Sequence, residues 1–244
     1  MSALLVLALL LFAPIGVSYA LDDREATSWS TARRDPTGLA PDPAMTPEAV
    51  IQVYAARAFA WRGVFSVHTW IVVKPEAAAS YTRYDVMGWG VERGVPAIRV
   101  DRMGPDNYWF GGKPEIVLER RGPEAGALID KIRAAVDSYP YPDFYRAWPG
   151  PNSNTFIAHI GREVPELGLE LPANAVGKDF LPNGALFAAS PSGTGYQLSL
   201  FGLAGLTLAL DEGLELNLLG LNMGVDPADL AIKLPGLGQI GIGS

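Results

Sequence analysis

One short run, residues 149–156 (Pro-Gly-Pro-Asn-Ser-Asn-Thr-Phe), constrains the fold of this chain more than any other segment. Its two prolines and its glycine end any helix or strand that precedes them. The hydroxyl of Ser153 then stands where an apolar helix begins, with Phe156 and Ile157 as its first apolar positions. Side chains at a helix N-terminus face unpaired backbone N–H groups and the positive end of the helix dipole. The run therefore predicts a loop followed by a helix start, the place for a nucleophile, an anion site or a simple helix cap.

Composition bounds the class of protein. The chain has 244 residues, of which 49% are hydrophobic, enough for one sizeable core. A net charge of −7 argues against a general nucleic-acid binder, which would carry a basic face. The 27 glycines, 20 prolines and only 18% charged residues favour a loop-rich domain that contains β-structure. Cysteine is absent, which excludes disulfides, thiolate metal sites and a cysteine nucleophile.

The N-terminal segment predicts the cellular location of the protein. Residues 1–20 carry no charge, and residues 18–20 (Ser-Tyr-Ala) have the small-x-small form of a signal-peptidase site. No Lys or Arg precedes the apolar run, so we interpret residues 1–20 as a signal peptide or a retained membrane anchor, with a buried core helix as a third alternative. Both leading interpretations place the rest of the chain outside the cytoplasm, as a periplasmic or membrane-anchored protein.

The rest of the chain divides into three parts. Residues 21–45 are polar and Pro-rich, which predicts an irregular linker. Residues 46–190 predict an α+β domain in which an antiparallel sheet packs against helices. Residues 191–244 predict a β-hairpin-rich C-terminal extension that packs on the same domain.

Periodicity places the elements of the α+β domain. A proline at the first helical position and an acid in the first turn predict a helix over residues 46–60. An apolar face predicts a second helix over residues 123–139, and the third runs over residues 154–161. Runs of β-branched and aromatic residues between Gly/Pro clusters predict an antiparallel meander. Its predicted strands are residues 65–73, 81–89, 97–103, 108–110 and 115–121.

The C-terminal extension carries a strong hairpin signal. Residues 206–210 and 214–218 alternate apolar and polar side chains on both sides of an Asp-Glu-Gly turn. Residues 195–203 predict another strand. A short helical turn at residues 226–231 and a Gly/Pro tail are predicted beyond it. The leucine-rich hairpin is interpreted as core or as a sheet that faces a partner.

Ser153 has one potential base in this sequence. A serine hydroxyl is a weak nucleophile until a base removes its proton, and imidazole does so near neutral pH. His68, in the predicted strand 65–73, is that base, and a third group must orient its ring. Asp85 or Tyr84 on the next strand fits, depending on the strand register. The sequence therefore predicts Ser153, His68 and Asp85 as catalytic candidates.

Other polar and aromatic residues around the helix start are predicted to bind a ligand, namely Asn152, Asn154, Tyr141 and Trp148. The simpler alternatives are that Ser153 or Asn152 only caps the helix and that the aromatic residues only pack in their loop. The two histidines lie 91 positions apart, and no metal-ligand spacing, phosphate loop or dinucleotide fingerprint is present. We therefore expect no metal and no cofactor.

Residues 152–156 (Asn-Ser-Asn-Thr-Phe) resemble the Asn-Cys-x-x-Phe motif of circularly permuted papain-like proteins of the NlpC/P60-like type. That resemblance implies an antiparallel sheet packed against helices, with a strand histidine that precedes a helix-start nucleophile, the order of His68 and Ser153. Known members are amidases, peptidases or acyltransferases. This chain departs from the motif because Ser153 replaces the cysteine, and a hydroxyl has no anion as accessible as a thiolate.

A second resemblance covers most of the chain, from about residue 45 to residue 241. Residues 148–156, 191–195 and 220–226 resemble the domain-of-unknown-function 3750 family, an uncharacterised bacterial family. This resemblance implies no particular activity.

Three functional hypotheses follow. The first is a degenerate papain-like module that binds a cell-envelope ligand without turnover, and it is preferred because the thiol is lost. The second is a serine hydrolase or acyltransferase on an envelope amide or ester, with Ser153 as nucleophile and His68 as base and then acid. The third is a structural envelope protein whose leucine-rich hairpin docks a membrane partner, which predicts an exposed apolar patch. None of them involves nucleic acid.

Overall fold

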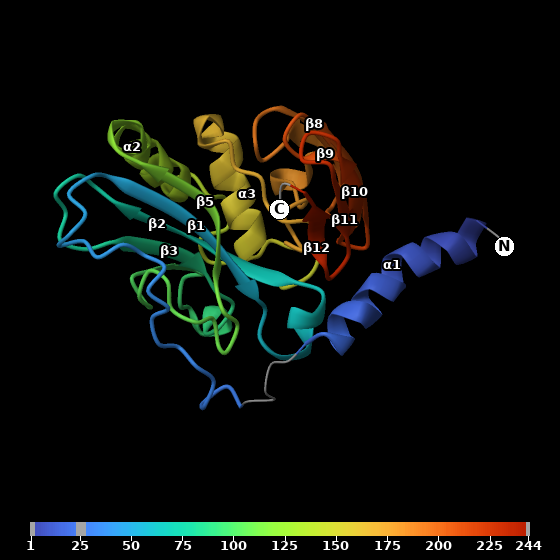
Figure 1. Ribbon diagram of the computed structural model, residues 1–244, viewed down its shortest axis with the longest axis horizontal. Helices are drawn as coiled ribbons and strands as arrows, with labels where there is room; N and C mark the ends of the chain where they lie inside the picture. Colours follow the sequence, from blue (N-terminus) through green and yellow to red (C-terminus); the bar gives the residue numbers. More distant parts are fainter. Residues whose placement is uncertain (1–2, 23–27, 243–244) are drawn as a thin grey trace.

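A computed structural model of the protein describes residues 3–22 and 28–242, and within them two antiparallel sheets flank helical elements (Figure 1). The arrangement confirms the predicted α+β class, with an antiparallel sheet packed against helices. Residues 1–2, 23–27 and 243–244 belong to the predicted N-terminal segment, linker and C-terminal tail. They lie outside the described residues.

The first sheet has five antiparallel strands in the order β4-β3-β2-β1-β5. Its two central strands pair over their whole length, with Ala56 opposite His68. β3 pairs with β2 at residues 71–73. The strands are β1 (Val50–Arg57), β2 (Val67–Lys74), β3 (Thr82–Val86), β4 (Ile98–Val100) and β5 (Glu115–Arg121).

Two predictions in this region are wrong. Residues predicted as the helix 46–60 form β1 instead, a strand that is buried on both faces. A central strand of this kind carries apolar residues on both faces, and such a run can imitate helical spacing. The predicted strand at residues 108–110 is also wrong, because there only Trp109 makes an isolated bridge, to Gly112.

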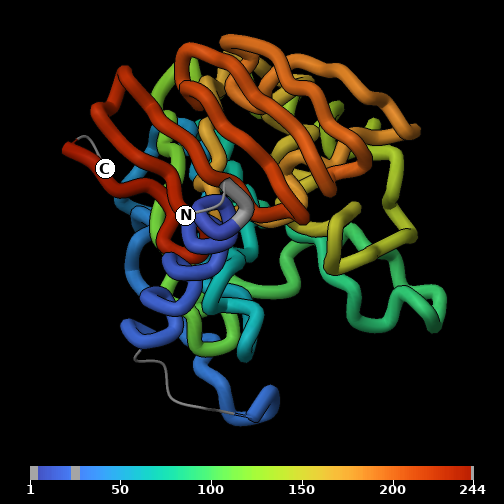
Figure 2. Tube along the Cα trace, turned by 90° about the vertical axis from the view of Figure 1, so that its right-hand side faces the viewer, coloured from blue at the N-terminus to red at the C-terminus, as the bar shows by residue number. Residues whose placement is uncertain are grey.

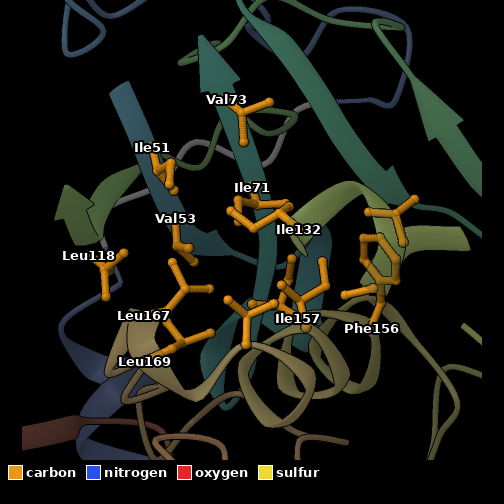
Figure 3. Close-up of a cluster of buried hydrophobic side chains, with 14 of the residues drawn as sticks. Ile51, Val53, Ile71, Val73, Leu118, Ile132, Phe156, Ile157, Leu167 and Leu169 are labelled. Carbon is orange, nitrogen blue, oxygen red and sulfur yellow. The ribbon is translucent and has the colours of Figure 1, made fainter. Parts of the chain in front are cut away.

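The main hydrophobic core lies between this sheet and two helices, α2 (Pro123–Asp137) and α3 (Ser153–Glu163). In Figure 3, Ile71 and Val73 of β2 lie on the side of the sheet that faces Ile132 of α2 and Ile157 of α3. Residues 153–161 of α3 are all buried. The N-terminus of α3 therefore lies inside the protein, against β2.

A second hydrophobic cluster covers the opposite face of the five-stranded sheet. Tyr54 and Trp70 stack there with ring centroids 5.3 Å apart, and Trp109 and Phe110 pack over them. The predicted linker supplies Ala32 to the same cluster. Both faces of the sheet are thus covered by apolar side chains.

The second sheet is a seven-stranded antiparallel meander in the order β12-β11-β10-β9-β8-β7-β6. The predicted hairpin forms β8 and β9. The helical turn predicted at residues 226–231 is wrong, because the Asp226 carboxylate accepts the backbone N–H groups of Ala228 and Asp229 and closes a tight turn between two strands. The strands are β6 (Phe187–Ala189), β7 (Gly195–Leu200), β8 (Ala204–Ala209), β9 (Gly213–Leu218), β10 (Leu221–Asp226), β11 (Ala231–Leu234) and β12 (Gly238–Gly241).

The second sheet buries its polar face and exposes its apolar face, the reverse of the usual arrangement. Its inner face, turned toward α3, buries polar and charged side chains such as Gln197, Glu215 and Lys233. Its other face, here called the outer face, exposes large apolar side chains. The outer face consists of Phe187, Tyr196, Leu198, Leu200, Leu206, Leu208, Leu214, Leu216, Val225, Ile232 and Ile240.

Helix α1 (Ala3–Ala20) is attached to the domain through its C-terminal end. The Ser18 hydroxyl donates to the carbonyl oxygen of Val64 at 2.5 Å and lies 3.3 Å from that of Gly236. Toward its N-terminus the helix projects from the domain (Figures 1 and 2). Within the part of the chain that the structure describes, no helix combines the length and the apolarity that crossing a membrane requires.

Candidate functional site

A cavity of about 1030 Å³ lies beside the start of β2, where the five-stranded sheet, α1 and the seven-stranded sheet approach one another. Its wall is mostly apolar and aromatic. His68 and residues 152–154 supply a polar part of the wall, and Arg62 and Glu92 also line it. The apolar part includes Phe12, Ile15, Trp61, Phe65, Trp89, Trp109, Trp148, Leu219 and Leu221.

His68 is held by a buried acidic and basic pair on β3. Its Nε2 lies 2.7 Å from one oxygen of Asp85, and Arg83 donates to the other oxygen from Nε at 3.1 Å and Nη2 at 2.7 Å. All three side chains are buried. Tyr84 points to the opposite face and packs against the helix-side core. The structure therefore brings His68 together with Asp85 and not with Tyr84.

Burial decides the protonation state of this pair. It lowers the pKa of His68, and the Asp85 carboxylate offsets only part of that effect. Burial alone would raise the pKa of Asp85, but the interactions with His68 and Arg83 outweigh it and lower the pKa. Near neutral pH the pair is thus a neutral imidazole beside a carboxylate. Nε2 then carries the proton that Asp85 accepts, and Nδ1 keeps the lone pair that a base needs.

Aromatic contacts fix the plane of the imidazole. The His68 ring stacks on Trp109, with centroids 3.5 Å apart and an angle of 4° between the planes. The Arg83 guanidinium lies 4.1 Å from the centre of the Trp70 ring. These contacts lie on the sheet face opposite α3, whereas the neighbouring Thr69 points toward α3. His68 therefore reaches the cavity from the far side of β2.

Ser153 is the first residue of α3, but it does not cap the helix. Asn152 is the cap, since its Oδ1 accepts the N–H groups of Asn154 at 2.9 Å and Thr155 at 3.1 Å. Among the described residues, neither the hydroxyl nor the backbone N–H of Ser153 has a hydrogen-bond partner. No hydrogen bond joins Ser153 to His68 in this part of the chain, although both line the same cavity.

The two asparagines beside Ser153 dock the helix start onto its surroundings. Asn154 donates from Nδ2 to the carbonyl oxygens of Val67 at 3.0 Å and Val176 at 2.8 Å. Its Oδ1 accepts the Thr69 hydroxyl at 2.9 Å. Asn152 also donates to Val176, at 2.9 Å. Both amides are thus occupied inside the protein, so Ser153 holds the unpaired donors of this segment.

The two aromatic candidates separate. Trp148 lines the cavity, and its indole N–H donates to the carbonyl oxygen of Leu219 at 2.8 Å. Tyr141 lies elsewhere, where its hydroxyl accepts the N–H of Asn183 at 3.0 Å. It borders a smaller cavity of about 270 Å³ beside Phe180. The structure brings Trp148 to the site and leaves Tyr141 outside it.

Most of the cavity wall carries no local signal in the sequence. Trp61, Trp109 and Leu221 come from three distant segments, and no local motif links them. Arg83 carried a usable signal, because residues two apart on a strand share a face, which places it beside Asp85.

One acidic group among the described residues could be considered for a metal. Oxygen atoms of Glu170, Asp226 and Asp229 lie within 4.8 Å of one another. The ammonium of Lys233 lies 2.5 Å from Glu170 and 3.7 Å from Asp226. That buried cation already pairs with two of the three carboxylates, so we assign no metal to them.

Comparison with known proteins gives one match, to the family described as "Protein of unknown function (DUF3750)", over residues 48–180. The chain belongs to this family. The matched span is more than half of the chain, contains His68, Asp85 and Ser153, and ends before β6. No curated protein and no solved structure matches the chain. Family membership confirms the resemblance to this family, while residues 191–195 and 220–226 lie outside the matched span and the papain-like resemblance stays a prediction.

Proposed function

We propose that this member of the DUF3750 family is an extracytoplasmic module that binds an amphipathic, acyl-bearing ligand in the cavity of about 1030 Å³. The observation that carries the proposal is the make-up of the cavity wall: apolar and aromatic side chains over most of it, and the unpaired donors of Ser153 in its polar part. Small-molecule sites of roughly 300–1,000 Å³ typically combine an apolar wall with a few placed polar groups.

The polar end of the ligand is assigned to the start of α3. The backbone N–H and the hydroxyl of Ser153 are free to donate, and the positive end of the helix favours a carboxylate or a carbonyl oxygen there. The apolar body then lies along Trp61, Trp89 and Phe12. The proposed envelope location rests on the uncharged, apolar residues 1–20, taken here in the retained form, because Phe12 and Ile15 of α1 line the cavity. The order of His68 and Ser153 agrees with a degenerate papain-like module that keeps a pocket and has lost the thiol.

Binding of cis-parinaric acid, a fluorescent fatty acid, tests the proposal. Ala58 lines the cavity, so Ala58→Trp fills part of it. We expect saturable binding to the wild type and at least about tenfold weaker binding to Ala58→Trp, since a lost apolar contact area of one side chain is worth about 1.4 kcal/mol or more. Ala79→Trp, in the exposed loop between β2 and β3, is the matched control and should bind as the wild type does. Equal affinity of Ala58→Trp and the wild type would remove the cavity from the proposal.

A second candidate function is hydrolysis of an acyl ester, favoured by one observation. The hydroxyl of Ser153 is unpaired, and the neutral His68 imidazole that borders the same cavity is oriented by Asp85. Ser153 Oγ would attack the ester carbonyl, His68 Nδ1 would take its proton and pass it to the leaving alcohol, and water would release the acyl group. Among the described residues, no hydrogen bond joins Ser153 to His68. A nucleophile displaced by about 1 Å from the attack geometry loses about 100-fold in rate, so binding without turnover is ranked first.

Turnover of p-nitrophenyl dodecanoate separates the two functions. The hydrolase predicts a rate that falls at least about 100-fold in both Ser153→Ala and His68→Ala. Ser138→Ala, at the C-terminal end of α2, is the control. The binding module predicts the same low rate for all four proteins, with cis-parinaric acid binding intact in the wild type and in Ser138→Ala.

A further inference from the structure

The outer face of the seven-stranded sheet is the largest feature that the proposed ligand site leaves unexplained. Its eleven large apolar residues, which are 37–65% exposed, give an area on the order of 1,000 Å², whereas the largest apolar patch of a typical soluble monomer is about 300–600 Å². Leu208 is 65% exposed and Tyr196 64%, although both lie in strands that are paired on both sides.

The inner face shows that this exposure is systematic. Along β9 the buried residues are Glu215 and Asn217, while Leu214 and Leu216 point outward. A sheet with one face in water normally turns its polar residues outward and its apolar ones inward. In this sheet the polar side chains are buried and the apolar ones point outward. The outer face therefore suits surroundings that are less polar than water.

Helix α1 extends the same apolar surface. Its residues are apolar all round, with Pro14, Gly16, Ser18 and Tyr19 as interruptions, and Leu9, Leu10 and Phe12 are about half exposed. It contacts β10 and β11 of the second sheet. In Figure 1 the helix projects on the side to which the outer face is turned, and in Figure 2 both face the viewer.

We propose that the outer face and α1 together dock the protein on one leaflet of a lipid bilayer, with their apolar side chains among the acyl chains. The occupant is lipid and not protein because of α1. A partner protein or a second copy would cover one stripe of a helix and leave a polar face on its other side. A helix without a polar face fits surroundings that are apolar in every direction, which hydrocarbon provides.

The absence of cysteine allows a direct test on the full chain. Leu208→Cys and Met45→Cys each give one labelling site for the environment-sensitive fluorophore NBD, on the outer face and on an exposed segment remote from it. With phosphatidylcholine vesicles, the label at position 208 should shift to shorter wavelength and gain intensity several-fold, and the label at position 45 should stay unchanged. No change at position 208 in a sample that binds the vesicles would overturn the proposal, since α1 alone would then carry the binding.

A second measurement follows the free energy of docking. Leu198→Glu combined with Leu208→Glu should lower the partition coefficient onto phosphatidylcholine vesicles at least about tenfold, because each leucine contributes apolar area and each carboxylate is costly among acyl chains. The matched control, Val95→Glu combined with Val100→Glu, changes exposed residues outside the outer face and should partition like the wild type.

The remaining outcomes count against lipid. A dimer in the absence of vesicles that the two glutamates dissociate would assign the outer face to a second copy. A monomer that does not bind vesicles would also refute the proposal. A failure of membrane docking would not count against the proposed ligand site in the cavity, because cis-parinaric acid binding is measured without vesicles.

Discussion

The two sheets of this protein are stabilised by different kinds of interaction. The five-stranded sheet has apolar clusters on both faces, and its helices bury Ile, Leu, Val and Phe against it. The seven-stranded sheet buries an ionic and amide network instead, in which Asp179 accepts from Asn217 at 2.6 Å and Asn222 at 2.7 Å. The family match covers the first sheet and ends before the second.

This difference shows that alternation along a strand predicts a sheet but not the direction in which its apolar face points. Apolar burial stabilises the first sheet without directional demands. The second sheet depends on partners that must match one by one, because a buried charge or amide without a partner is costly. The second sheet should therefore be destabilised most by substitutions that remove a buried charge or amide. The first sheet should be destabilised most by substitutions that remove buried apolar volume.

The largest effect is expected from Lys178, whose buried ammonium lies beside the inner face of the second sheet. Lys178→Met removes the cation that pairs with Asp179 and leaves Glu215 with Lys233 alone, which should lower the free energy of unfolding by about 3–5 kcal/mol. Chemical denaturation measures it. Lys131→Met, which breaks an exposed pair with Glu166, should change the same quantity by less than about 1 kcal/mol. Equal effects of the two substitutions would show that the buried ion pairs stabilise the second sheet no more than an exposed pair does.

A cavity in the first region comes next. Ile157→Ala removes a fully buried side chain between α3 and the five-stranded sheet, and it should cost about 3 kcal/mol. The midpoint of urea unfolding reports this loss. Ile116→Ala on β5, where the side chain is 37% exposed, serves as the control and should cost about 1 kcal/mol or less. A negligible effect at position 157 would mean that the apolar core is not what holds this sheet.

Acid should weaken the first region through His68. The unfolded histidine takes up a proton near its ordinary pKa of 6.5, whereas burial lowers the pKa in the folded protein. The unfolded state therefore binds more protons below pH 6.5, and the free energy of unfolding falls as the pH decreases from 7 to 5, with His68 contributing to that fall.

His68→Gln tests this assignment, since the fall between pH 7 and pH 5 should become smaller in the variant. His159, whose pKa is also lowered by burial, remains in the variant and keeps part of the fall. Unfolding curves at the two pH values measure the difference. An unchanged fall would mean that the His68 imidazole is equally easy to protonate in both states.

The smallest effect is expected on the outer face. Leu208→Ser should change the free energy of unfolding by less than about 0.5 kcal/mol, because the leucine is 65% exposed in the folded chain. The thermal midpoint of the monomeric protein without lipid measures it. A loss above about 1.5 kcal/mol would show that the outer face packs against another part of the chain and would erase the contrast between the two sheets.

Local patterns predicted much of the fold. The helix over residues 123–137, the start of α3 and the hairpin of β8 and β9 follow from capping residues and strict alternation. The strand β1 did not, because a strand buried on both faces has no alternation to read. Strands β10 to β12 were missed because a carboxylate-closed turn at Asp226 resembles a helix start.

The candidate site was predictable only in part. The pairing of His68 with Asp85 could be named as one of two alternatives, since register decides which side chain of β3 faces the ring. The role of Asn152 as the cap could also be named. The cavity itself could not, because its wall joins α1, η1 (Ala60–Val64), the loop around Trp109 and the turn between β9 and β10, and tertiary packing alone brings these together.

A crystal structure of the protein with a fatty acid that carries bromine at the end of its tail tests the central claim most directly. We expect an anomalous bromine peak among Trp61, Trp89 and Phe12 and a carboxylate within hydrogen-bond distance of Ser153. A bromine peak confined to the outer face, or a cavity that stays empty at saturating ligand, would contradict it.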